Sequence, residues 1–353
     1  MSPKIIIIDT YYPEFLDTIQ VNPEGSYAGE LQRILNMCFG TFDAYSRNLR
    51  ALGWDAVDVI ANCRPLQELW ARENNYQPET LHSILLEQIR RFEPDVVFYQ
   101  DLSFSSVYAL EILSKQYVLA GQCSCPLPSP ARIACFKTIM TSFPHYLNYF
   151  ADLGVEGVYV PLAFDPIVYD RWRKLPPGGR AKSRDCVFVG GMGRPGHWEF
   201  GMKVLESVAR QVPSTQFYGY GAETLPHDSP IRERHRGPLW GIGMYETFNE
   251  SRIVLNRHGE IAGEYANNLR MFEATGAGAL LITDHKRNIG EFFTADEVVT
   301  YRSTAEAVGM IRYYLTHPQD ARKIASAGAA RTYKSHTYWN RMPIVSAALE
   351  QWL

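Results

Sequence analysis

Charged and amide side chains lie between two apolar, strand-like runs in residues 252–284, RIVLNRHGEIAGEYANNLRMFEATGAGALLITD. The first run ends in Asn256, Arg257 and His258. Arg270 and Glu273 share one face of a short expected helix, because residues three apart on a helix are neighbours. The segment predicts a βαβ unit, in which ligands bind at the carboxyl ends of strands and at helix N-termini. The arginines and the glutamate therefore lie where a nucleotide would be held.

A literal G-x-G-x-x-G begins at Gly191 and includes Gly193, after an expected strand and before an expected helix. A dinucleotide site also needs an acidic residue about 20 residues later, at the tip of the next strand. That strand, residues 215–218, continues instead into glycine, tyrosine and glycine. The pattern favours close backbone approach to a diphosphate, with Arg194 adding positive charge and the following helix its dipole. An NAD site and a turn that only packs are the alternatives.

Four basic side chains would then surround one anionic group: Arg194, Arg257, His258 and Arg270. Arginine suits this role because its planar guanidinium holds phosphate oxygens with two hydrogen bonds. Fixed positive groups of this kind can stabilise the negative charge of a diphosphate without a metal. The alternative for each arginine is a solvated salt bridge, and for Glu273 a pair with Arg270 on the helix face.

A reaction that removes a proton from a substrate also needs a side chain that accepts it. Asp101 directly follows the expected strand 95–100, where an active-site carboxylate belongs. Its alternative role is to cap the helix that follows. His145 lies at an expected helix start, where a lone histidine can also be structural, and Asp43 is a third candidate.

Apolar runs alternate with helical stretches along the whole chain, which is typical of doubly wound parallel sheets. The strands expected in the first half are residues 4–9, 56–61, 95–100, 117–121, 133–138 and 157–161. Helices are expected at residues 45–52 and 80–92. The segment KLPPGGRAK is typical of a linker because of its prolines and glycines, and a second series of strands begins after it.

The length of 353 residues agrees with roughly two domains of about 150 residues each. We assign residues 1–173 to a first domain, which carries the candidate proton acceptors, 174–182 to the linker, 183–338 to a second, nucleotide-binding domain, and 339–353 to a final helix. The formal net charge of −3 gives no reason to expect nucleic-acid binding. The six cysteines include no C-x-x-C and are interpreted as reduced thiols. The apolar opening run, residues 5–8, is too short for a signal or membrane segment, so we expect a cytoplasmic protein.

Several segments in this order resemble one family. They are PDVVFYQDLSF (94–104), TSFPHYLNYFADLGV (141–155), VYVPLAFDP (158–166), the pattern Asn268-x-Arg270-x-Phe272-Glu273-Ala274 followed by GAGALLITD, and HTYWNRM (336–342). The resemblance extends over most of the chain. The sequence resembles CgeB-like, spore-maturation-type glycosyltransferases, which are similar to group 1 glycosyl transferases.

The resemblance implies an α/β protein of the GT-B fold, with two Rossmann-like doubly wound domains facing across a cleft and a final helix that returns to the first domain. It also implies that Glu273 binds the donor ribose. Retaining relatives carry a second glutamate eight residues earlier, where this sequence has Tyr265. The sequence contains no D-x-D, the acidic pair with which many glycosyltransferases hold manganese, so we expect neither a metal nor another cofactor.

The expected activity is transfer of a sugar from a nucleoside diphosphate sugar, such as a UDP-sugar, to a hydroxyl of a glycan, lipid-linked or protein acceptor. A sugar-nucleotide epimerase or hydrolase and a non-catalytic nucleotide-sugar-binding protein are the alternatives. The predicted donor-binding residues are Gly191, Gly193, Arg194, Arg257, His258, Asn268, Arg270 and Glu273. The predicted catalytic residues are Asp101 and His145.

Overall fold

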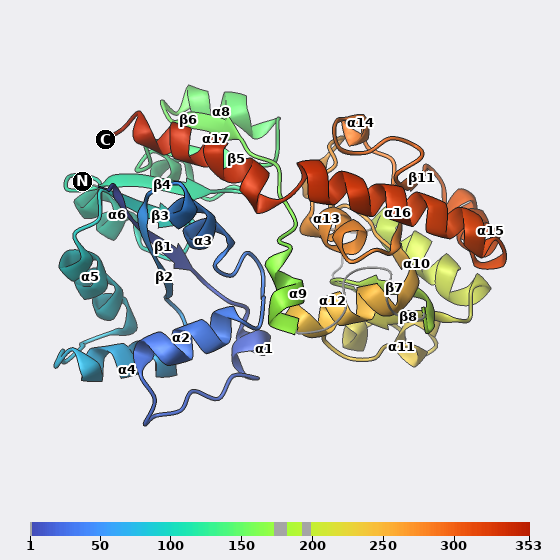
Figure 1. Cartoon of the computed structure of the whole chain (residues 1–353), viewed down its shortest axis with the longest axis horizontal. Helices are drawn as coiled ribbons and strands as arrows, with labels where there is room; N and C mark the ends of the chain where they lie inside the picture. The colour runs from blue at the N-terminus through green and yellow to red at the C-terminus, as the bar shows by residue number, and fades with distance from the viewer. Residues whose placement is uncertain (1, 173–181, 193–198) are drawn as a thin grey trace. The chain divides into compact units, whose positions relative to one another are not determined.

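The computed structural model describes residues 2–172, 182–192 and 199–353 (Figure 1). The chain forms two compact units. Unit 1 comprises residues 1–161 and 338–353, and unit 2 comprises residues 162–337. Each unit is an α/β structure built on its own parallel sheet, so the predicted fold class is confirmed.

Unit 1 contains a six-stranded sheet in the order β2-β1-β3-β4-β5-β6. All neighbouring strands are parallel. The elements are β1 (Lys4–Asp9), α1 (Pro13–Leu16), α2 (Tyr27–Leu35), α3 (Ala44–Ala51), β2 (Asp55–Ile60), α4 (Arg64–Glu73), α5 (Leu81–Phe92), β3 (Val96–Tyr99), α6 (Val107–Leu113), β4 (Val118–Gln122), α7 (Pro130–Ile133), β5 (Thr138–Thr141), α8 (Tyr146–Asp152), β6 (Glu156–Tyr159) and α17 (Tyr338–Glu350).

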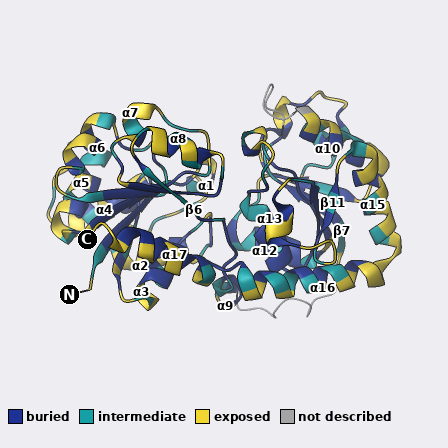
Figure 2. Ribbon diagram, turned by 90° about the horizontal axis from the view of Figure 1, so that it is seen from above, coloured by how far each residue is buried: buried dark blue, intermediate teal, exposed yellow. Residues whose placement is uncertain are grey.

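The central strands of unit 1 are buried on both faces, as Figure 2 shows by their dark blue colour. β1 reads KIIIID, and all four residues of β3 are fully buried. Such continuous apolar runs are typical of parallel strands, which helices cover on both sides. Helix α17 belongs to this unit, and the indole N–H of Trp54 donates a hydrogen bond to Ser346 of α17 at 2.8 Å.

Unit 2 contains a five-stranded parallel sheet in the order β11-β10-β9-β7-β8. The elements are α9 (Ile167–Trp172), β7 (Arg184–Val189), α10 (Glu199–Gln211), β8 (Thr215–Tyr218), η1 (Ala222–Thr224), α11 (Pro230–Glu233), α12 (Gly241–Glu250), β9 (Ser251–Leu255), η2 (Glu260–Ala262), α13 (Leu269–Gly276), β10 (Leu280–Asp284), α14 (Ile289–Phe292), β11 (Val299–Tyr301), α15 (Thr304–Thr316) and α16 (Pro318–Ser335).

Two groups of helices cover this second sheet (Figure 2). Helices α12, α13 and α16 pack in one group, and α10, α11 and α15 form the other. The core contains buried strand residues such as Phe188, Phe217, Leu255 and Ile282. Apolar burial of this kind is the main driving force for folding.

The strand expected at residues 133–138 is a wrong prediction. Ser129 and Pro130 instead begin the short helix α7, and the strand β5 starts at Thr138. Proline at the first helical position is favoured because its missing N–H would have no partner there. The apolar residues Ile133 and Phe136 are buried without belonging to a strand.

The division between the units lies at residues 161 and 162, ahead of the linker expected at 174–182. Residues 174–181 of that expected linker lie outside the described residues. The contacts of the preceding segment explain the earlier division. Phe164 pairs with Thr337 in a parallel bridge, and the Tyr169 hydroxyl donates to the carbonyl of Gly276 at 3.0 Å. Helix α9 is thereby fixed to unit 2.

No helix in the described part of the chain is long and apolar enough to cross a membrane.

Candidate functional site

The sheet of unit 2 brings two loops together at one point of its carboxyl edge. From β7 the chain continues to β8 on one side, whereas β9 lies on the other side of β7. At such a switch point the connections diverge, and open α/β sheets bind ligands there. The loop after β7 contains residues 190–192 and the loop after β9 contains residues 256–258. Both segments include predicted donor-binding residues.

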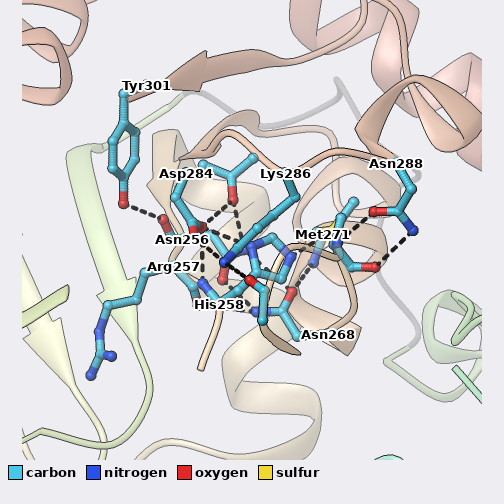
Figure 3. Close-up of polar contacts among 12 residues, drawn as sticks. Asn256, Arg257, His258, Asn268, Met271, Asp284, Lys286, Asn288 and Tyr301 are labelled. Atoms are coloured by element: carbon cyan, nitrogen blue, oxygen red, sulfur yellow. Dashed lines mark hydrogen bonds and ion pairs between the residues drawn. The ribbon is translucent and has the colours of Figure 1, made fainter. Parts of the chain in front are cut away.

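Asp284, the last residue of β10, anchors the loop after β9 (Figure 3). Its Oδ1 accepts hydrogen bonds from the backbone N–H of His258 at 2.9 Å and from Nδ1 of the same residue at 2.7 Å. Nε2 of His258 lies 3.1 Å from Sδ of Met271 in α13. The imidazole is fully buried, so both ring nitrogens contact protein groups. His258 therefore fixes the loop and does not face a ligand in this arrangement.

Electrostatics keep the Asp284 carboxylate charged. Burial raises its pKa, while the hydrogen bonds and charge of His258 lower it. The Nζ of Lys286, 3.5 Å from Oδ2, also lowers it. Together these groups hold the pKa of Asp284 at about 2. A pKa this low favours the ionised carboxylate at neutral pH.

Two asparagines join the same loop to α13 (Figure 3). The side chain of Asn268 caps α13 by accepting the N–H of Met271. Its Nδ2 donates to Oδ1 of Asn256 at 3.0 Å and to the carbonyl of Arg257 at 3.1 Å. The Tyr301 hydroxyl donates to the carbonyl of Asn256 at 3.0 Å. Asn268 therefore supports the backbone that carries Arg257.

Arg257 spans the switch point. Its Nη2 donates to the carbonyl of Gly191 in the loop after β7 at 2.9 Å. Its side chain also passes Gly201 of α10, where an added Cβ would lie 2.5 Å from Cδ of the arginine. Glycine at that position makes room for Arg257. In Figure 3 the guanidinium points away from the His258 ring, and burial lowers the pKa of Arg257.

Arg270 approaches the same strand end from α13. Its Nε donates to the carbonyl of Val189 at 3.1 Å, two residues before Gly191. Its Nη1 forms an ion pair with Oε2 of Glu273 at 2.5 Å and also contacts Sδ of Met244. The structure thus brings the guanidinium groups of two predicted residues to the carbonyls of residues 189–191.

Glu273 is buried beside Arg270. Its Oε1 accepts a hydrogen bond from the Tyr245 hydroxyl at 3.3 Å. Burial raises the pKa of Glu273, while the charge of Arg270 and the Tyr245 hydrogen bond lower it, and burial prevails. Carboxyl groups with a pKa perturbed in this way are found more often at functional sites than elsewhere.

The backbone of residues 190–192 lies directly against that of residues 219–221. Gly190 N–H donates to the carbonyl of Tyr218 at 3.0 Å, and Met192 N–H to that of Tyr220 at 2.8 Å. Gly221 has φ +88°, and a Cβ there would lie 1.8 Å from the Met192 carbonyl oxygen. Only glycine fits such a position.

The other members of the glycine-rich motif, Gly193, Arg194 and Gly196, lie outside the described residues.

Residues 235–241 start along the outer edge of β8, where Phe217 and His235 form a parallel bridge. Arg236 N–H donates to the carbonyl of Phe217 at 2.8 Å, and Gly219 N–H donates to the carbonyl of Gly237 at 3.0 Å. Trp240 then precedes α12 as its N-cap residue. The segment therefore reaches the same carboxyl edge as the loop after β7.

Unit 1 has a second switch point, between β1 and β3. β1 leads to β2 on one side, and β3 lies on its other side. Asp9 ends β1 and Asp101 follows β3. Thr10 joins the two carboxylates, since its N–H donates to Oδ1 of Asp9 at 2.8 Å and its hydroxyl to Oδ2 of Asp101 at 2.8 Å.

Asp9 is a candidate that the sequence interpretation missed, because it was read only as the end of a strand. Burial raises its pKa to about 7. The N–H of Thr10 lowers this pKa, and the charges of Asp101 and Asp58 raise it. The signal that identifies Asp101, a carboxylate at the carboxyl end of a buried strand, applies equally to Asp9. A carboxyl group with a pKa near 7 is suited to accept a proton at neutral pH.

Asp101 does not cap the helix that follows it. Its Oδ1 accepts the N–H of Ser103 at 2.8 Å, whereas α6 is capped by the side chain of Ser106. The Asp101 carboxylate is instead held by Thr10 and Ser103 at the strand end.

His145 and Asp43 lie elsewhere in unit 1. His145 is exposed and precedes α8, and its ring centroid is 5.2 Å from that of Phe143 and 4.7 Å from that of Tyr146. It follows β5, which β4 separates from β3 and Asp101. Asp43 is buried before α3, 3.8 Å from Nε of Arg47.

Within residues 2–172, 182–192 and 199–353, no three His, Cys, Asp or Glu side chains are grouped closely enough to hold a metal ion.

Comparison with known proteins gives a partial family match and a fold. Residues 202–345 match the family described as Glycosyl transferase-like. No curated protein matches the sequence. HepE from Anabaena, solved in complex with UDP and glucose, is similar over 99% of this chain and 100% of its own, with a TM-score of 0.62 at 12% identity.

Two further solved structures are similar to this chain. Sucrose-phosphate synthase from Thermosynechococcus elongatus has a TM-score of 0.58 at 11% identity, over 99% of this chain and 98% of its own. UDP-GlcNAc 2-epimerase from Neisseria meningitidis, bound to UDP-GlcNAc, has a TM-score of 0.52 at 11% identity, over 99% of this chain and 100% of its own. The chain thus has the GT-B fold, and the match to the family described as Glycosyl transferase-like is confined to residues 202–345.

Proposed function

We propose that the protein transfers a sugar from a nucleoside diphosphate sugar to an acceptor hydroxyl. One observation carries the proposal: Arg257 and Arg270 both bond to carbonyls of residues 189–191, at the switch point of the unit 2 sheet. Two guanidinium groups at this place form a positive site where β7 ends and the glycine-rich loop begins. Such a site suits the diphosphate, whose charge grows as the glycosidic bond breaks.

Neighbouring groups in unit 2 complete the proposed donor site. Nη2 of Arg270 makes no hydrogen bond within the described residues, and this donor is the one we assign to phosphate. Glu273 would accept hydrogen bonds from ribose hydroxyls, and residues 235–240 would lie beside the base. HepE was solved with UDP and UDP-glucose, which makes UDP-sugars the first donors to test. We propose that binding requires no metal, and that the chain is of the CgeB-like type.

Unit 1 supplies the proposed proton acceptor. Asp9 and Asp101 lie at its switch point, and the raised pKa of Asp9 makes this residue the stronger candidate. His145 remains the alternative. In a retaining reaction the departing phosphate can itself take the acceptor proton, so the anomeric configuration of the product decides whether a protein base is required.

A second candidate function is epimerisation or hydrolysis of a sugar nucleotide. The similarity to UDP-GlcNAc 2-epimerase favours testing it. A panel of UDP- and GDP-sugars with glycan, lipid-linked and peptide acceptors, followed by mass spectrometry, separates the possibilities. A glycosylated acceptor supports the transferase. A new sugar nucleotide or free sugar without an acceptor product supports the epimerase or hydrolase, and binding without turnover supports a non-catalytic protein.

A further inference from the structure

Arg257 is held by backbone contacts on both sides. The N–H of Asn256 donates to the carbonyl of Ile282 at 2.8 Å, which continues the pairing of β9 with β10. The N–H of His258 donates to Oδ1 of Asp284 at 2.9 Å. The carbonyl of Arg257 itself accepts from Asn268. The direction of the arginine side chain is therefore set by the way in which residues 256–258 are anchored.

One carboxylate oxygen provides most of the anchor on the His258 side. Oδ1 of Asp284 accepts hydrogen bonds from the backbone N–H of His258, from Nδ1 of His258 at 2.7 Å and from the hydroxyl of Thr283 at 3.2 Å. The imidazole is enclosed between this carboxylate and Met271 of α13 (Figure 3). Removing the partner of a buried polar group strongly destabilises the folded protein. The loop after β9 therefore depends on the Asp284 carboxylate.

The effect extends to the loop after β7 through the Arg257 guanidinium. Its Nη2 bonds to the carbonyl of Gly191, so a shift of the loop after β9 moves the group that holds the glycine-rich segment. That segment has little freedom on its other side, where Gly221 packs against Met192. Small displacements of a positioned group have large consequences for binding and rate.

We propose that Asp284 is a positioning residue for diphosphate binding, which holds Arg257 against Gly191 by fixing the His258 backbone and ring. The role rests on the proposed donor site. In this role His258 lies behind the binding surface. Asp284 affects binding of the phosphate end of the ligand without contacting the ligand.

Calorimetric titration of UDP and uridine into four proteins tests this role: wild type, Asp284→Asn, Arg257→Ala and the double variant. Asp284→Asn should weaken UDP binding by about tenfold, the effect of losing one charge-assisted hydrogen bond, and leave uridine binding unchanged. The double variant should bind UDP no more weakly than Arg257→Ala, because residues that act through one another are not additive. Asp296→Asn, an exposed carboxylate, is the matched control and should bind like wild type.

Unchanged UDP affinity in Asp284→Asn, equal losses for both ligands, or independent losses in the double variant would each overturn the role. If Asp284→Asn does not fold, His258→Asn and His258→Leu replace it. The asparagine amide takes the position of Nδ1, so this variant should lose less UDP affinity than the leucine variant, and equal losses contradict the proposal. A wild type that binds no nucleoside diphosphate removes the proposed function itself, whereas a wild type that binds while Asp284→Asn is normal removes the positioning role alone.

Discussion

Arg270 is the residue whose removal should separate phosphate binding from nucleoside binding. Arg270→Ala should weaken UDP binding by about tenfold or more and uridine binding little, because a charge-assisted hydrogen bond contributes about 1.5–3 kcal/mol. Arg210→Ala is the matched control, since Arg210 also pairs with a glutamate on its own helix but is exposed. Titration calorimetry measures both affinities. Equal losses for the two ligands would place Arg270 away from the phosphates.

Glu273→Gln should weaken UDP and uridine alike, because the proposed ribose contact is common to both ligands. The same substitution should change the pH dependence of stability. The pKa of Glu273 is raised in the folded protein, so its contribution to stability is fully present below the usual glutamate pKa and is lost as pH rises through the folded value.

Urea unfolding between pH 4 and pH 8 measures this dependence. The wild type should lose more free energy of unfolding over this interval than Glu273→Gln. Identical slopes for the two proteins would show that burial does not raise the pKa of this carboxyl group.

A pH–rate profile tests whether Asp9 is the proton acceptor. If Asp9 accepts the acceptor proton, kcat should rise with pH through an apparent pKa of about 7. Asp9→Asn should lower kcat by roughly 10² to 10⁴ while donor affinity is unchanged. Asp101→Asn removes a neighbouring charge and should move the acid limb to lower pH.

A normal rate in Asp9→Asn would eliminate Asp9 as the base. Asp101→Asn would then be examined for the same loss, and normal turnover in both variants would leave His145 or the donor phosphate. Proton NMR of the product anomer distinguishes these two, since retention of configuration favours the donor phosphate.

At the residue scale, the sequence predicted that Arg257 and Arg270 lie close to one anionic ligand, and binding of that ligand stays a prediction. Arg257 and Arg270 do come together at one strand end. The partners of the loop could not be predicted, because Asn256, Asp284 and Tyr301 meet only when three strands are placed side by side. His258 follows a strand in the same way, but its ring is turned into the core by Asp284. Sequence alone does not distinguish these directions.

At the scale of elements, the contact between the segment 219–221 and the loop after β7 should be sensitive to a single methyl group. Gly221 and Gly237 have nearly equal φ values, +88° and +89°, but only Gly221 has a neighbour within 4 Å of an added Cβ. Gly221→Ala should therefore lower the melting temperature more than Gly237→Ala, which carries only the backbone strain of about 1–2 kcal/mol. Equal losses would mean that strain alone accounts for both glycines.

Strands were the elements best predicted from sequence, because continuous apolar runs such as β1 and β3 require burial on both faces. The prediction of a strand at residues 133–138 was wrong for a local reason. Their apolar residues are buried, but Ser129 and Pro130 start a helix turn that ends at Ile133. Burial alone does not distinguish a strand from a buried turn.

At the scale of the whole molecule, alternation of strands and helices was sufficient to predict two parallel α/β sheets. The division between them was harder to predict. Proline and glycine mark the expected linker, whereas the structure fixes Phe164 and Tyr169 to unit 2 before that linker begins. Such long-range contacts leave no local pattern in the sequence.

Unit 2 is proposed to bind a nucleoside diphosphate through arginine side chains and without a metal. Thermal unfolding of the wild type with UDP, GDP, TDP or NAD, each with and without EDTA, tests it most directly. A ligand at a hundred times its Kd stabilises the folded protein by about 2.7 kcal/mol, which is readily measured. We predict that UDP or GDP raises the melting temperature equally with and without EDTA. A shift that EDTA abolishes, or a shift with NAD alone, would contradict the account.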